Sequence, residues 1–164
     1  MSLNEEVELL RAIPLFAGIE PSRLKLLAFA SERLTYAAGA ELFHQRDPGD
    51  AAYVLIDGEV DILIDTAQGM KAVVRLKRND LVGEIAILCD LPRTATVRAA
   101  SELTTLRISK DLFFRLITEF PNMAVSVMRD LAHRIETMNQ KLREANEKLA
   151  DAEQRLRQPS SPAG

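Results

Sequence analysis

The segment from Gly83 to Ala99 combines one carboxylate and one guanidinium in a pattern that suits a phosphorylated sugar. Glu84 begins a short apolar turn, and Arg93 follows a tight connection through residues 90–92 and leads into a strand-like run. An arginine donates two parallel hydrogen bonds to a phosphate, and free N–H groups in the first turn of a helix also attract an anion. A carboxylate accepts a hydrogen bond from a sugar hydroxyl. These residues therefore indicate a site for a sugar that carries an internal phosphate.

The same segment, GEIAILCDLPRTATVRA, closely resembles the phosphate-binding cassette of cyclic nucleotide-binding domains. That family contains the bacterial catabolite activator protein and the regulatory subunits of cyclic-nucleotide-dependent kinases. The resemblance covers about residues 12–140, because upstream segments also match the family's helices, turns and strands: Pro14-Leu15-Phe16 with Leu24, Leu26 and Leu27, then Gly39 to Phe43, Asp47 to Asp50, Tyr53-Val54 and Gly58-Glu59-Val60.

The resemblance implies a role for each cassette residue. Glu84 takes the ribose 2′-hydroxyl and Arg93 takes the cyclic phosphate, with help from the backbone N–H groups of Ala86 and Ala95. The complete set of expected ligand-binding residues is Val82, Gly83, Glu84, Ile85, Ala86, Arg93, Thr94 and Ala95. The alternative is that Glu84 and Arg93 form an ordinary structural ion pair.

The expected ligand is cAMP, with cGMP as the alternative. Thr94 leaves cGMP open, because a hydroxyl at this position could reach the phosphate or the amino group of a syn guanine. Met138 and Asn139 align with helix positions that cap the purine in the catabolite activator protein, and Val74 is a further candidate purine contact. Met138 also lies on the apolar seam of its helix, so a packing role is its alternative.

No other group of residues indicates chemistry. His44 and His133 are too few and too far apart for a metal site, and Cys89 is expected to be a small packing residue. No nucleophile–base pair or glycine-rich kinase loop is present, so we expect a protein that is not an enzyme. A pI of about 5.5 and a net charge of −3 argue against DNA binding. Short apolar runs and an acidic N-terminal stretch predict a cytoplasmic protein without a membrane span.

The elements that position the cassette follow from periodicity. Apolar spacing predicts helices over 4–11, 21–32 and 109–119, the last capped by Ser109 or Asp111. Between them, residues 34–108 show short strands at turn intervals typical of an antiparallel sandwich or barrel, with Val60, Ile62 and Ile64 alternating with polar neighbours and Leu63. With the resemblance, this predicts an α+β domain over 1–120 built on an antiparallel β jelly roll. Arg46 and Asn79 stand where the family usually has glycine.

The C-terminal helix is predicted over 121–158, with a tail over 159–164. Its apolar residues recur in steps of three and four, the heptad pattern of a coiled coil. The expected dimer seam comprises Met128, Leu131, Ile135, Met138, Leu142, Ala145, Leu149, Ala152 and Leu156. A parallel homodimer is preferred, although the alanines also suit antiparallel pairing.

Together these features predict a non-enzymatic receptor for a cyclic nucleotide. It would be dimeric and would pass ligand binding through its last helix to an unidentified downstream protein. One alternative is a dimerising scaffold that binds no ligand. The other is a relative of transcription regulators that has lost its DNA-binding domain.

Overall fold

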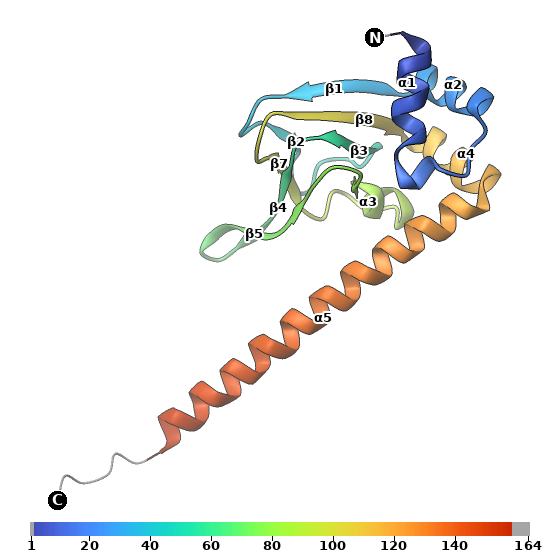
Figure 1. Cartoon of the computed structure of the whole chain (residues 1–164). Helices are drawn as coiled ribbons and strands as arrows, with labels where there is room; N and C mark the ends of the chain where they lie inside the picture. The colour runs from blue at the N-terminus through green and yellow to red at the C-terminus, as the bar shows by residue number, and fades with distance from the viewer. Residues whose placement is uncertain (1, 159–164) are drawn as a thin grey trace, which may run out of the picture. The chain divides into compact units, whose positions relative to one another are not determined.

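The computed structural model describes residues 2–158 (Figure 1). By its internal contacts the chain divides into two compact units, Met1–Ala124 and Val125–Gly164. The first unit holds the helices and strands that surround the cassette, and the second holds most of the long C-terminal helix.

Three short helical segments open the first unit. They are α1 (Leu3–Arg11), the 3₁₀ turn η1 (Pro14–Phe16) and α2 (Pro21–Ala30). Ser2 caps α1, and the Glu5 side chain accepts from the Ser2 N–H in return, so two otherwise unpaired donors are satisfied. The helix expected over 21–32 ends at Ala30, because Ser31 is extended and Glu32 already pairs with Arg107 in a sheet.

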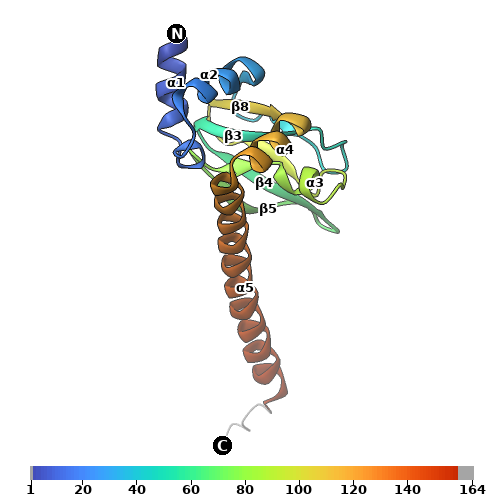
Figure 2. The same ribbon diagram turned by 90° about the vertical axis from the view of Figure 1, so that its right-hand side faces the viewer.

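Two four-stranded antiparallel sheets follow (Figures 1 and 2). One sheet has the order β1 (Glu32–Tyr36), β8 (Leu103–Ser109), β3 (Ala51–Asp57) and β6 (Leu81–Val82). The other has the order β2 (Glu41–Phe43), β7 (Thr96–Ala99), β4 (Val60–Thr66) and β5 (Gly69–Leu76). Both sheets contribute to one buried core, which includes Tyr53 and Leu55 from the first and Val60 and Val97 from the second. The predicted antiparallel β-roll with flanking helices is confirmed.

The alternation expected in β4 is only partly correct. Val60 is buried and Ile62 packs against the core, but the next buried residue is Leu63 rather than Ile64. The register of β4 with β5 shifts between Ile62 and Leu63, which pair with Val74 and Ala72, so the extra residue of this bulge lies in β5.

Three helices complete the structure: α3 (Glu84–Leu88), α4 (Lys110–Glu119) and α5 (Pro121–Arg157). The predicted cap of α4 is Ser109, whose hydroxyl accepts a hydrogen bond from the Leu112 N–H at 3.3 Å. Both departures from glycine adopt the left-handed conformation, with φ of 77° at Arg46 and 75° at Asn79.

The second unit is described by its helix alone. Most large apolar residues of the expected seam are exposed in the single chain, for example Ile135 at 60% and Leu142 at 59%, whereas Leu131 is half-buried. The predicted tail over 159–164 lies outside the described residues.

Candidate functional site

Gly83 connects β6 to α3 and sets the position of Glu84. Gly83 is the N-cap of α3 and has a φ of 88°, a left-handed conformation that glycine adopts without a steric penalty. The chain therefore turns directly from the strand into the helix. Glu84 is the first helical residue, and its side chain is buried, with a relative exposure of 2%. A carboxylate is thus held inside the first unit at the start of a short helix.

The guanidinium of Arg93 lies against the same end of α3. Its Nη1 donates to the Gly83 carbonyl at 2.9 Å, and its Nη2 donates to the Ala51 carbonyl of β3 at 2.7 Å. The guanidinium carbon lies 3.9 Å from the centre of the Phe43 ring, within the range of a cation–π interaction. Arg93 is 3% exposed, so these groups hold a buried cation beside the residue that precedes Glu84.

The fit between Gly83 and Arg93 allows no side chain at position 83. A Cβ atom on Gly83 would lie 2.8 Å from Arg93 Nη1, 3.1 Å from the Ala51 carbonyl oxygen and 3.3 Å from a carbon of the Phe43 ring. Glycine is therefore required here both for its backbone conformation and for the space that the guanidinium occupies.

A neighbouring loop fixes the backbone of Arg93. Its N–H donates to the Asp47 carbonyl, and its carbonyl accepts from the Arg46 N–H, both at 2.8 Å. The Asp47 side chain accepts from the His44 N–H at 3.0 Å and closes the turn that contains the left-handed Arg46. On the same loop, a side chain at Gly49 would collide with the Cβ of Ala86 in α3. The loop thus packs against α3 and holds the backbone of Arg93 close to this helix.

The guanidinium of Arg93 is buried and has a carboxylate nearby. Burial lowers the pKa of Arg93, whereas Tyr53 and Asp50 oppose that shift, Asp50 with a carboxylate oxygen 3.7 Å from Nη2. An arginine nonetheless stays protonated in proteins. No group in the described part of the chain accepts a hydrogen bond from the buried Nε. The guanidinium is therefore a desolvated cation with donor capacity to spare.

The remaining predicted residues fall into two groups. Val82, Ala86 and Ala95 are buried or half-buried around the cassette, whereas Ile85 and Thr94 are exposed. Val74 on β5 is half-buried and packs against the core of the roll, as do Phe43 and Ile62.

Met138 and Asn139 belong to the second unit, where both are exposed. A contact of either residue with a purine stays a prediction.

Sequence reasoning missed Phe43 and Ala51 as partners of Arg93. Their positions lie far from Arg93 along the chain, and one of the two contacts uses only a backbone carbonyl, which no residue type reveals. The one signal in the sequence that pointed toward Phe43 is its position as the last residue of the segment Gly39 to Phe43, which matches the family.

Residues 2–158 contain neither a cluster suited to a metal ion nor a helix suited to a membrane. No cluster of three or more His, Cys, Asp or Glu side chains in this range is arranged to hold a metal ion. Likewise, no helix in this range has the length and apolar character needed to cross a membrane.

Comparisons with known proteins identify the family of this chain. Residues 33–120 match the family model described as the cyclic nucleotide-binding domain. The chain is 33% identical to a cAMP-dependent protein kinase regulatory subunit from Emericella nidulans, over 70% of this chain and 27% of that protein. It is 28% identical to a CRP-like cAMP-activated global transcriptional regulator from Mycobacterium tuberculosis, over 88% of this chain and 62% of that protein.

A solved structure shows the same fold along the whole chain. The sensor domain of the transcriptional regulator DNR from Pseudomonas aeruginosa matches 99% of this chain and 98% of that one, with a TM-score of 0.70 and 22% identity. The chain thus spans 27% and 62% of the lengths of these two relatives. Its fold matches 98% of the solved sensor domain. The family match covers more than half of the sequence and includes α3, Glu84 and Arg93, and the chain belongs to the cyclic nucleotide-binding domain family.

Proposed function

We propose that this protein is a non-enzymatic receptor for a cyclic nucleotide, with cAMP preferred over cGMP. The observation that carries the proposal is the buried guanidinium of Arg93, held at the N-terminal end of α3 with its Nε available as a donor. A desolvated cation beside backbone N–H groups is the arrangement that a buried phosphate requires. The cAMP dependence named in two relatives supports the choice of ligand.

In this proposal different cassette residues bind different parts of the ligand. Arg93 binds the cyclic phosphate together with the N–H groups of Ala86 and Ala95, and Glu84 accepts from the ribose 2′-hydroxyl. The surrounding residues Val82, Gly83, Ile85 and Thr94 shape the site, and Val74 supplies a wall for the purine.

The second unit supplies the proposed output. An exposed heptad seam on a helix of this length is typical of a coiled-coil strand, and we propose that two copies pair through it. Met138 and Asn139 then link the ligand to the paired helices, which signal to a downstream protein.

Isothermal titration calorimetry with cAMP and with cGMP tests the proposal. The expected result is saturable binding of both nucleotides, or of cAMP alone. Where both bind, the dissociation constant for cAMP should be the lower one. Tighter binding of cGMP would reverse the proposed preference. Absence of heat and of any change in melting temperature with either nucleotide would refute the receptor function.

A ligand-free dimerising scaffold is the second candidate, and one observation favours it. Both Nη atoms of Arg93 already donate to backbone carbonyls, so the protein's own groups satisfy much of the guanidinium. Mass spectrometry of the small molecules released from denatured protein separates the two candidates. A released cyclic nucleotide supports the receptor, whereas none released and no calorimetric binding supports the scaffold.

A further inference from the structure

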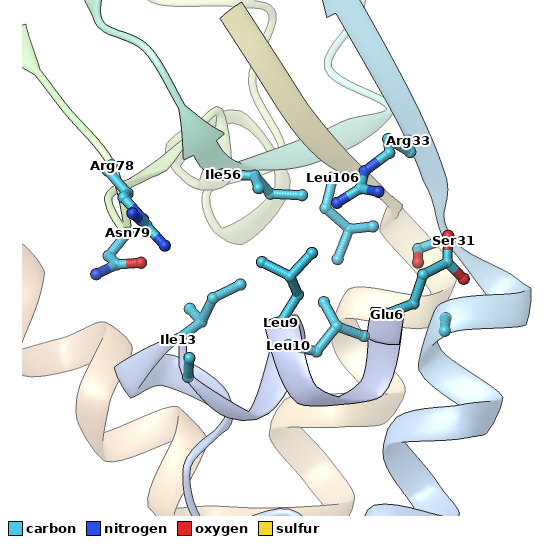
Figure 3. Close-up of a pocket in the computed structure, with 12 residues that line it drawn as sticks. Glu6, Leu9, Leu10, Ile13, Ser31, Arg33, Ile56, Arg78, Asn79 and Leu106 are labelled. Atoms are coloured by element: carbon cyan, nitrogen blue, oxygen red, sulfur yellow. The ribbon is translucent and has the colours of Figure 1, made fainter. Parts of the chain in front are cut away.

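A pocket of about 320 Å³ lies between α1 and the outer face of the sheet that contains β1, β8 and β3 (Figure 3). Cross-strand pairing places it on this face. Leu106 of β8 pairs with Arg33 of β1, so both side chains project from the same face, whereas the adjacent Leu34 packs against the core of the roll. The pocket is therefore separated by a sheet from the roll interior in which Tyr53 lies.

The walls of the pocket are apolar. Leu9, Leu10 and Ile13 project from α1 and its C-terminal end, and they face Ile56 and Leu106 of the sheet (Figure 3). Four of these five side chains are almost fully buried, with exposures between 3% for Leu10 and 9% for Ile56. The volume falls within the range of small-molecule sites, and the lining suits the apolar body of a ligand.

The two ends of the pocket differ in charge. In Figure 3 the guanidinium groups of Arg33 and Arg78 approach the apolar floor from opposite ends. Glu6, the one acidic residue among the lining residues of the described chain, lies at the Arg33 end. Its carboxylate lies at the same end as Arg33, whereas none of the lining residues at the Arg78 end, beside the side chain of Asn79, is acidic.

From this arrangement we infer that the pocket binds an amphipathic monoanion, a carboxylate on an apolar chain or ring. The carboxylate pairs with Arg78 and accepts from the amide of Asn79, and the apolar body lies between α1 and the sheet. Arginine suits this role, since its planar fork matches a carboxylate. The site is independent of the proposed nucleotide site, and it does not rest on that function.

The backbone at the Arg78 end is well fixed. The Asn79 N–H donates to the Leu55 carbonyl at 2.8 Å, and the Leu55 N–H donates to the Asp80 carbonyl at 2.9 Å. The Asp80 side chain also accepts from the Lys77 N–H at 2.9 Å. The turn that carries Arg78 and Asn79 is thus anchored to β3 at several points, and a fixed turn can present two side chains to a ligand.

Methyl NMR of the full chain tests the inference, with decanoate as the probe below its micellar concentration. We expect saturable shifts centred on the methyl groups of Leu9, Leu10, Ile13, Ile56 and Leu106, both with and without excess cAMP. Decanol and decyltrimethylammonium, which have the same chain and no negative charge, should bind at least about threefold more weakly, as expected for the loss of one exposed ion pair.

Matched variants identify the charged end. Arg78→Gln should weaken decanoate binding at least about threefold and leave decanol unchanged. Arg11→Gln removes the same charge from α1 at a residue that does not line the pocket, and it should have no effect. Ala28→Leu, which adds a side chain to the lining, should weaken both probes, with melting curves to verify folding.

Three outcomes would overturn the inference. The first is no saturable shift at the pocket methyl groups. The second is shifts confined to the exposed apolar residues of α5, which would indicate adsorption to the seam. The third is equal affinity for decanoate and decanol, which would leave an apolar pocket without the proposed anion site. Failure of the protein to bind cyclic nucleotides would not affect any of these results.

Discussion

At the scale of single residues, the shape of the Arg93 guanidinium is as important as its charge. Two backbone carbonyls fix its orientation, and the Phe43 ring packs against its face. A lysine ammonium has no planar fork and cannot reproduce this geometry.

We therefore predict that Arg93→Lys raises the dissociation constant for cAMP by more than about tenfold, as expected for the loss of charge-assisted hydrogen bonds. Calorimetry measures the change. Arg75→Lys is the control, because Arg75 is an exposed residue of β5. Its Nε donates to Oδ1 of Asp61 in β4 at 2.9 Å. Unchanged affinity in the Arg93 variant would show that the guanidinium fork does not hold the ligand.

Gly83 provides a second prediction at this scale. Gly83→Ala should lower both stability and cAMP affinity, because the added Cβ is forced into the left-handed region and toward Arg93 Nη1. A backbone in that region costs about 1–3 kcal/mol for a residue other than glycine. Chemical denaturation and calorimetry measure the two effects.

Gly39→Ala is the matched control, since its φ of 90° is nearly the same and no atom lies within 4 Å of its added Cβ. It should lose stability and keep its affinity. Equal loss of affinity in both variants would mean that backbone strain, and not displacement of Arg93, explains the effect.

At the scale of elements, the heptad seam of α5 predicts a helix pair. Leu142→Lys places a charge in the centre of the proposed seam, where an unpaired buried cation is strongly unfavourable. We expect the dimer dissociation constant to rise by more than about tenfold, measured by sedimentation equilibrium.

The control for this variant is Gln140→Lys, which adds the same charge at an exposed position outside the seam. It should leave self-association unchanged. A wild-type protein that sediments as a monomer, or equal effects of the two variants, would contradict pairing through this seam.

At the scale of the whole molecule, ligand binding to the folded state must raise the melting temperature. A ligand at 100 times its dissociation constant adds about 2.7 kcal/mol to the free energy of unfolding. For a unit the size of Met1–Ala124 this corresponds to an increase of roughly 10 °C.

Differential scanning calorimetry measures this increase with cAMP, and Arg93→Lys should reduce it to about half or less at the same ligand concentration. An increase of the same size in that variant would place the ligand elsewhere on the molecule. Decanoate should give a separate and additive increase if its pocket lies outside the roll.

The amino-acid sequence alone determined what depends on short spacing. The cap at Ser109 is set by residues close along the chain and is found where the sequence predicts it, and the short helix that begins at Glu84 follows directly from the turn at Gly83. The periodicity of strands and helices, together with the family resemblance, predicted the antiparallel roll.

Tertiary structure decided what depends on register and on backbone atoms. Phe43 and Ala51 contact Arg93 only because two sheets and a loop converge there, and in β4 the buried residue is Leu63 rather than Ile64. The pocket between α1 and the sheet exists because Arg33, Ile56 and Leu106 share one face across three strands. The types of the residues do not reveal which distant segments will contact one another, because these contacts form only once the strands have paired.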